Sequence, residues 1–175
     1  MPTTSGDHGR LEWMRTLALR YRHIKEIYEA FNGDAAHLLG DTKAEVWTRV
    51  CGEVDRLTRG WCNHLRHILE VISARPSYRN VLISSSPLPL TFTRLLLHGL
   101  GRVFAADNVY AANKIGKETC FERISARFGR KAVCIVIGST AEQRNLALQL
   151  NWPYWDISLE TDLVALAHAL ELGFL

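Results

Sequence analysis

The most constraining feature of this chain is a series of short apolar runs, alternating with helix-length segments, that begins after Pro76. Four runs have the length and side chains of buried strands, and they lie at 81–83, 108–112, 132–137 and 154–157. Helical patterns fill the intervals at 90–100, 116–128, 141–150 and 162–172. Strands separated by helices of this length pair in parallel, because each helix carries the chain back along the sheet. The sequence therefore predicts an α/β core over residues 76–175.

The first part of the chain, residues 11–75, has the periodicity of helices instead. Apolar side chains recur every three or four positions over the ranges 13–28 and 46–72. Thr42 and Glu45 have the spacing of a capping box, which favours a helix start at this point. The pattern predicts two long helices, the second running unbroken to about residue 72, packed as an antiparallel hairpin.

Composition and charge exclude several classes of protein. The net charge of +3 at pH 7 is too small to indicate binding to nucleic acid or to a membrane surface. No stretch approaches the roughly 18 consecutive apolar residues of a transmembrane helix. The polar residues 1–10 lack the apolar core of a signal peptide and are predicted to form a disordered lead-in. Four cysteines without metal-site spacing indicate reduced thiols in an intracellular protein.

Two strand ends carry residues that suit a phosphate, since ligands of open parallel sheets bind beyond the carboxyl ends of the strands. Ser84, Ser85 and Ser86 follow the first strand and offer hydroxyl and backbone N–H groups, although serines that turn the chain would look the same. Lys117 lies in the first turn of the helix after the second strand. A cation there opposes the helix dipole by ~0.3–1 kcal/mol unless it faces an anion. A solvated surface lysine is the alternative.

The end of the third strand lacks the residue that phosphoryl transfer needs. An aspartate that holds magnesium is expected at such a place, and the chain has Ser139. Glu142 nearby is either a weak ligand or an ordinary first-turn helix residue. The sequence contains no Asp-x-Asp motif and no glycine-rich phosphate loop. The residues are therefore compatible with phosphate contacts but lack the acids of a magnesium site.

Several segments match long, specific motifs rather than a general pattern. They are 13–15, 21–22, 80–86, 114–124, 127–131, 153–158 and 168–172. These segments resemble the Eyes absent family, whose longest shared motif reads KxGKESCFERI…RFGRK. The resemblance extends from about His8 to Leu175, nearly the whole chain.

The resemblance implies a haloacid-dehalogenase-like fold, a parallel sheet with helices on both faces. It assigns residues 11–75 to part of a helical cap and 76–175 to a partial α/β core. The family is a magnesium-dependent protein-tyrosine phosphatase and a co-activator of Six-type homeodomain proteins, found in nucleus and cytoplasm. By match, Ser85 stands at the family's phosphate-binding threonine and Lys117 at its phosphate-neutralising lysine.

The chain departs from the family's pattern at two places. The motif DxDxT, with the aspartate nucleophile, would lie upstream of Met1. Its strand would be central, between 81–84 and 132–138, so its absence predicts two half-sheets with either paired edges or a groove between them. The family's later acidic motif is also changed, because Ser139 replaces the magnesium-binding aspartate and Gln143 and Arg144 replace two acids.

These departures favour a protein-binding co-activator role without catalysis and without bound Mg²⁺. The alternative is an active tyrosine phosphatase, if an upstream segment supplies DxDxT. The family's Six-binding surface includes the C-terminal helix, where Ala165 and Ala169 keep one side thin enough for a close partner helix. Alanines packed against the sheet would give the same pattern.

Overall fold

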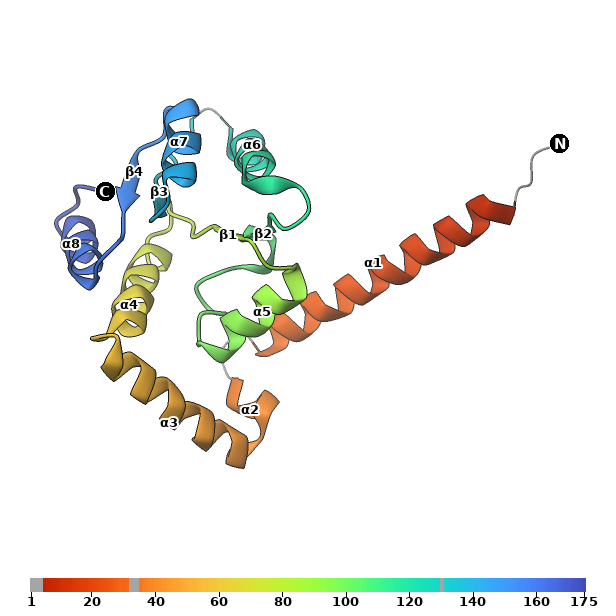
Figure 1. The fold of residues 1–175 in the computed structure, drawn as a ribbon, viewed down its shortest axis with the longest axis horizontal. Helices are drawn as coiled ribbons and strands as arrows, with labels where there is room; N and C mark the ends of the chain where they lie inside the picture. Colours follow the sequence, from red (N-terminus) through yellow and green to blue (C-terminus); the bar gives the residue numbers. More distant parts are fainter. Residues whose placement is uncertain (1–4, 32–34, 130) are drawn as a thin grey trace.

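The computed structural model describes residues 5–31, 35–129 and 131–175. It is a mixed α/β structure, mostly helical, with short parallel strands (Figure 1). The elements in chain order are α1 (Ser5–Phe31), α2 (Ala35–Leu39), α3 (Asp41–Leu57), α4 (Trp61–Ser73), β1 (Leu82–Ser84), α5 (Leu88–Leu97), the 3-10 helix η1 (Ala106–Asn108), β2 (Val109–Ala111), α6 (Gly116–Phe128), β3 (Val136–Gly138), α7 (Ala141–Gln149), β4 (Tyr154–Asp156) and α8 (Glu160–Glu171). In the described ranges, no helix is both long and apolar enough to cross a membrane.

The strands form two separate parallel pairs. Leu82 of β1 lies opposite Val109 of β2, and Val136 of β3 lies opposite Tyr154 of β4. Among the described residues, β1 and β3 each have one neighbouring strand, and the two pairs are not hydrogen-bonded to each other. These pairs are the two half-sheets that the family resemblance implies, 81–84 with 108–112 and 132–138 with 154–157, and their edges are not joined. The strand expected between them stays a prediction.

The strand predicted at 132–137 is shorter than expected. Its ladder begins at Val136, whose N–H donates to the Pro153 carbonyl over 2.8 Å. The residues just before Pro153 belong to the turn that ends α7, where Asn151 has a φ of 54°, so no strand precedes β4 to pair with residues 132–135. Residues 132–135 are therefore outside the ladder, and the Val133 side chain is 84% exposed.

The single long helix predicted from Thr42 to about residue 72 is wrong, because two helices replace it. Arg59 and Gly60 have positive φ values of 56° and 82°, and the Gly60 N–H donates to the Asp55 carbonyl over 2.8 Å. This is the geometry that ends a helix. The Asp55 carboxylate then accepts the N–H groups of Cys62 and Asn63, at 3.0 and 3.3 Å, which caps the start of α4.

Two further expectations for the N-terminal part are also wrong. The capping box of Thr42 and Glu45 does not form, since α3 begins at Asp41 after Gly40 and has no side-chain cap. The lead-in predicted for 1–10 is helical from Ser5 onward, because the turns of α1 continue into it, and residues 1–4 lie outside the described part.

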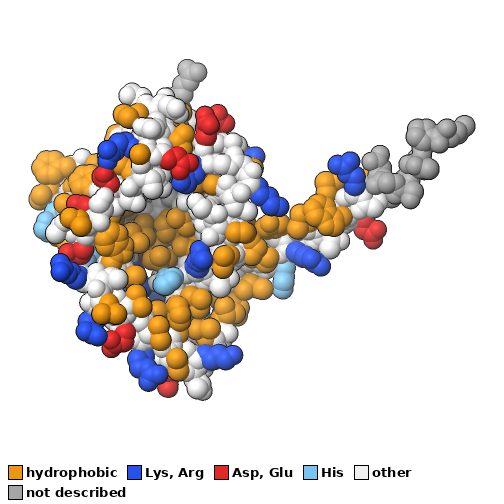
Figure 2. Space-filling view, in the orientation of Figure 1, with side chains coloured by type: hydrophobic (Ala, Val, Ile, Leu, Met, Phe, Trp, Pro, Cys, Tyr) orange, Lys and Arg blue, Asp and Glu red, His pale blue; other side chains and the backbone are white. Residues whose placement is uncertain are grey.

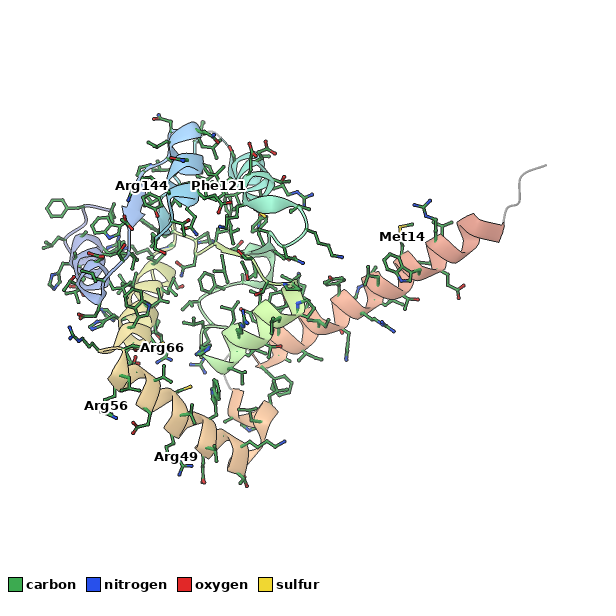
Figure 3. The ribbon with its side chains drawn as sticks, viewed as in Figure 1. Met14, Arg49, Arg56, Arg66, Phe121 and Arg144 are labelled. Carbon is green, nitrogen blue, oxygen red and sulfur yellow. The ribbon has the colours of Figure 1, made fainter. Side chains whose placement is uncertain are left out.

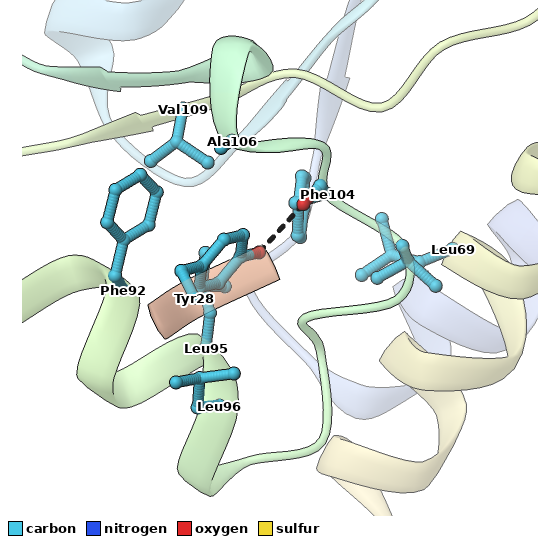
Figure 4. Packing of buried hydrophobic residues seen from close by; sticks show 9 residues of the cluster. Tyr28, Leu69, Phe92, Leu95, Leu96, Phe104, Ala106 and Val109 are labelled. Atoms are coloured by element: carbon cyan, nitrogen blue, oxygen red, sulfur yellow. Dashed lines mark hydrogen bonds between the residues drawn. The ribbon is translucent and has the colours of Figure 1, made fainter. Parts of the chain in front are cut away.

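The antiparallel hairpin is absent as well, because the C-terminal half of α1 packs on α5 and η1 instead. The Tyr28 ring stacks on Phe92 with centroids 4.3 Å apart, and its hydroxyl donates to the Phe104 carbonyl over 2.7 Å (Figure 4). Lys25 Nζ lies 2.7 Å from the Asp107 carboxylate in η1. The N-terminal half of α1 projects away from the body (Figure 1).

Two clusters of buried side chains in the described part of the chain meet at α4. The first contains Tyr28, Leu69, Phe92, Leu95, Leu96, Val103, Phe104, Ala106 and Val109 (Figure 4). The second contains Ile68, Ile157, Leu163, Leu166 and Leu170. Helix α4 supplies Ile68 to one cluster and Leu69 to the other, so it is the element that both halves share.

Candidate functional site

The three serines at the end of β1 divide into two structural residues and one that is free for a ligand. The Ser84 hydroxyl accepts from the Ser86 N–H at 3.1 Å and from the Thr91 hydroxyl at 2.9 Å. The Ser86 hydroxyl accepts from Arg94 at 2.9 Å. Both therefore hold the turn into α5. Ser85 is exposed, and its side chain has no hydrogen bond to the described part of the chain.

Lys117 faces an anion, as the dipole argument requires, and this anion is Glu142. Its Nζ forms an ion pair with the Glu142 carboxylate in the first turn of α7. The pair joins the helix after β2 to the helix after β3, so it links the carboxyl ends of the two sheets. The Lys117 side chain is 20% exposed and that of Glu142 is 59% exposed. Pairs open to water in this way contribute only about 0–1 kcal/mol, so an incoming phosphate could displace the glutamate.

The end of β3 is closed by a capping box rather than by acids. The Thr140 hydroxyl accepts from the Gln143 N–H at 3.3 Å. In return, Gln143 Oε1 accepts the N–H groups of Ser139 and Thr140, both at 3.1 Å. A Cβ at Gly138 would collide with the Gln143 side chain, so a glycine suits this position. Gln143 is therefore committed to starting α7.

A guanidinium group lies beside the carboxyl end of β4. Arg144, on α7 next to β4, forms an ion pair with Asp156, and its guanidinium carbon lies 5.3 Å from the Tyr154 ring centroid (Figure 3). Burial, and to a smaller degree Asp156, raises the pKa of the Tyr154 hydroxyl. The Asp156 carboxylate is thus paired with a cation of the chain itself.

The residues at these strand ends do not fit a magnesium site. Mg²⁺ requires oxygen ligands in octahedral geometry, usually including carboxylates. Ser139 offers a hydroxyl, Gln143 Oε1 is bonded to backbone N–H groups, and Arg144 brings a positive charge. Across 5–31, 35–129 and 131–175, no group of three or more His, Cys, Asp or Glu side chains could hold a metal ion.

Helix α8 turns a buried face to the core and a thin face outward. Leu163, Leu166 and Leu170 are buried in the second cluster. Ala165 is exposed on the opposite side, and Ala169 is half-buried at its border. The sequence also allowed these alanines to pack against the sheet, and for Ala165 this alternative is wrong because its side chain is exposed.

The start of α8 is fixed by one carboxylate. Asp162 accepts the N–H groups of Leu159 and Ser158, at 2.7 and 2.8 Å. These backbone hydrogen bonds hold the pKa of Asp162 below its usual value. The cap defines where the helix begins and so which side chains its outer face presents.

Sequence reasoning missed the partners of the charged site residues. The sequence leaves Glu142 as either a weak metal ligand or a first-turn helix residue, and in the structure it is the partner of Lys117. No pattern in the sequence singles out Asp156, which pairs with Arg144. Both pairs join elements that follow different strands, so no local spacing indicates them.

Comparisons with known proteins give a consistent result. No family model matches the chain. The chain is 46% identical to human Protein phosphatase EYA2 over 171 residues, which is 98% of this chain and 32% of that protein. It is 43% identical to Protein phosphatase eya of Drosophila melanogaster over 175 residues, all of this chain and 23% of that protein.

A shorter relative decides the assignment. Protein phosphatase EYA3 of Gallus gallus is 41% identical over 117 residues, which is 67% of this chain and 98% of that sequence. The chain belongs to the Eyes absent family. The resemblance drawn from the motifs is confirmed, and the mixed α/β structure is consistent with the family's haloacid-dehalogenase-like fold. The chain spans about a third or less of the length of the human and fly Eyes absent relatives.

Proposed function

We propose that this chain is a protein-binding domain of the Eyes absent family that acts as a co-activator without phosphatase activity of its own. The observation that carries the proposal is the Arg144–Asp156 ion pair beside the Gln143 capping box. Phosphoryl transfer to an aspartate needs a carboxylate nucleophile and a metal cation that offsets the developing charge. The strand ends of this chain provide an arginine and an amide in the region where the family has acids.

The alternative, a phosphatase completed by an upstream DxDxT segment, is supported by a different pair of residues. Ser85 is free, and Lys117 is bound only by an exposed ion pair. These are the two positions that match the family's phosphate contacts. In that case Mg²⁺ would need acids from the upstream segment, because Ser139 cannot replace a carboxylate ligand.

A phosphatase assay separates the two functions. The chain is incubated with a phosphotyrosine peptide and magnesium, beside the Lys117→Ala variant, and phosphate release is measured. We expect equal background rates for both proteins. Turnover that disappears in Lys117→Ala would overturn the co-activator proposal. Addition of a separate DxDxT peptide tests the alternative directly, since rescue of turnover would favour it.

The partner in this proposal is a Six-type homeodomain protein, which the outer face of α8 would contact. Ala165 is exposed, so a partner helix can approach the α8 backbone closely there. Such contacts belong to a protein of the nucleus and cytoplasm that reaches DNA through its partner. Ala165→Arg should abolish capture by a Six-type domain in a pull-down. Leu148→Arg, at a 67% exposed position on α7, is the control that should bind normally. Unchanged capture by folded Ala165→Arg would exclude α8 from the interface.

We also propose that in longer family members the nucleophile-bearing strand lies between β1 and β3. Both strands have a free edge among the described residues, and Ile137 on β3 is 40% exposed. Figure 2 shows a hollow in the body with hydrophobic side chains around it. Amide hydrogen exchange of the chain, measured with and without the DxDxT peptide, tests where this strand lies. Protection confined to 80–84 and 132–138 supports it, and protection elsewhere contradicts it.

A further inference from the structure

Helix α3 carries an apolar face that the described chain covers only in part. Val46, Val50, Val54 and Leu57 recur at helical spacing, and their exposed fractions are 48, 45, 45 and 73%. These four residues are called the α3 face. The helix has no buried residue at all. Isolated helices of this length are marginal in water, so their stability comes from packing an apolar face.

A second uncovered apolar face lies on the projecting half of α1, residues 9–23, called the α1 arm. The stripe that begins in the core at Tyr28 continues outward through Tyr21, Leu17 and Trp13. Tyr21 is 39% exposed and Trp13 is 66% exposed. From Trp13 to Tyr21 the stripe extends for about 12 Å, and the α3 face extends for about 16 Å. The α3 face is therefore long enough to cover the stripe of the arm.

The arm cannot reach the α3 face of its own chain. The base of α1 is fixed by the Tyr28 hydrogen bond to Phe104 and by the ion pair of Lys25 with Asp107. Helix α3 is fixed by Trp47, whose Nε1–H donates to the Leu97 carbonyl over 2.7 Å. Figures 1 and 3 show the arm pointing away from α3, with Met14 near its outer end. Hydrophobic side chains along the arm and over α3 remain open on the face seen in Figure 2.

Charge and area are compatible with a contact between the two faces. The arm has four arginines, at positions 10, 15, 20 and 22, against Glu12. Helix α3 has four acids against three basic residues. A reciprocal contact would cover four faces, each roughly 300–400 Å² for a few large side chains. The total lies near the ~1,200–2,000 Å² of a standard interface.

We propose that two copies of this chain form a two-fold symmetric dimer by arm exchange, in which the α1 arm of each copy lies on the α3 face of the other. Two-fold symmetry uses each contact twice and leaves neither face uncovered. An intramolecular contact is blocked by the fixed base of α1, so a second copy is the occupant that carries both complementary faces at once.

Sedimentation velocity of the chain at micromolar concentrations tests the proposal. The expected mass is twice 19.8 kDa. Trp13→Glu and Val50→Glu should each weaken the dimer about tenfold or more, because each buries an unpaired charge in the contact. Leu19→Glu and Thr48→Glu place the same charge on the opposite sides of the same helices and should leave the dimer intact. All four side chains are exposed and lie outside the two core clusters, so each variant should stay folded as a monomer.

Mixing the two weakened variants distinguishes arm exchange from other dimers. The Trp13→Glu copy keeps an intact α3 face and the Val50→Glu copy keeps an intact arm, so the mixture can form one of the two contacts. We expect a heterodimer weaker than the native dimer and stronger than either variant alone. A native monomer, an open-ended oligomer, or a Val50→Glu variant that dimerises normally would each overturn the proposal.

Discussion

Tyr28→Phe tests how the base of α1 is held in the body. The Tyr28 side chain is 1% exposed, its ring stacks on Phe92, and its hydroxyl donates to the Phe104 carbonyl. Phenylalanine keeps the ring and its packing and removes only the hydroxyl. The substitution therefore isolates one buried hydrogen bond from the rest of the first cluster.

The expected effect has one part at neutral pH and another at alkaline pH. Near pH 8 the variant loses the hydrogen bond, which lowers the free energy of unfolding by about 0.5–1.5 kcal/mol. Burial raises the pKa of Tyr28 from 10.0 to about 12. The native protein thus holds this proton more tightly than the unfolded chain does. That stability is fully present below pH 10 and is lost as the pH rises toward 12, with a loss of about 1.4 kcal/mol at pH 11.

Urea unfolding of both proteins at pH 8 and pH 11, followed by tryptophan fluorescence, measures the two parts. Other titrating groups are common to both proteins, so they cancel in the difference between the two unfolding free energies. We expect Tyr28→Phe to be less stable at pH 8 and equal to the native protein, or more stable, at pH 11. A difference that does not change with pH would refute the burial of the hydroxyl.

Three further substitutions, two of them with a matched control, test the bend and the second cluster. Gly60→Ala should destabilise the fold by about 1–2 kcal/mol in thermal unfolding, because Gly60 has a φ of 82°. Gly52→Ala is the control inside α3, where an added Cβ meets open space, and it should stabilise the fold by up to ~1 kcal/mol. Asp55→Ala should cost about 0.5–2 kcal/mol by removing the cap of α4, seen as lower helicity in circular dichroism, and full helicity would contradict the cap. Leu163→Ala, at a 1% exposed position, should lower the unfolding free energy by about 2–5 kcal/mol in urea. The matched Leu159→Ala at a 65% exposed position should change it by under ~0.5 kcal/mol, and equal effects would show that α8 is not packed as described.

The α/β half could be predicted from the sequence because its signals are local. Helix α6 begins and ends at the predicted residues, Gly116 and Phe128, and Gly129 follows it with a φ of 75°. The parallel direction of the strands follows from the alternation of strands and helices, whereas their division into two pairs is what the family resemblance implies. Ser85 and Lys117 could be placed at strand ends for the same reason.

The N-terminal half could not be predicted, because its signals continue through the bend. The apolar stripe continues past Gly60 without a break, and a glycine inside a helix costs only about 1 kcal/mol relative to alanine. Nothing in the sequence predicts the positive φ of Arg59. Packing α1 on α5 instead of on α3 depends on contacts between residues far apart in the sequence, such as Tyr28 with Phe104.

The position of α4 between the two clusters governs how the molecule opens. Ile68 and Leu69 are neighbours in sequence and point about 100° apart around the helix, so a single turn is enclosed by both cores. Amides in that turn can exchange with solvent only when both cores open, whereas α8 or α5 can be released by the loss of one. A one-residue insertion ahead of Ile68 would rotate every later side chain of α4 by the same 100° and misdirect both cores at once. The turn of α4 that holds Ile68 and Leu69 therefore links the two clusters, and the length of α4 is the part of the fold that tolerates an insertion least.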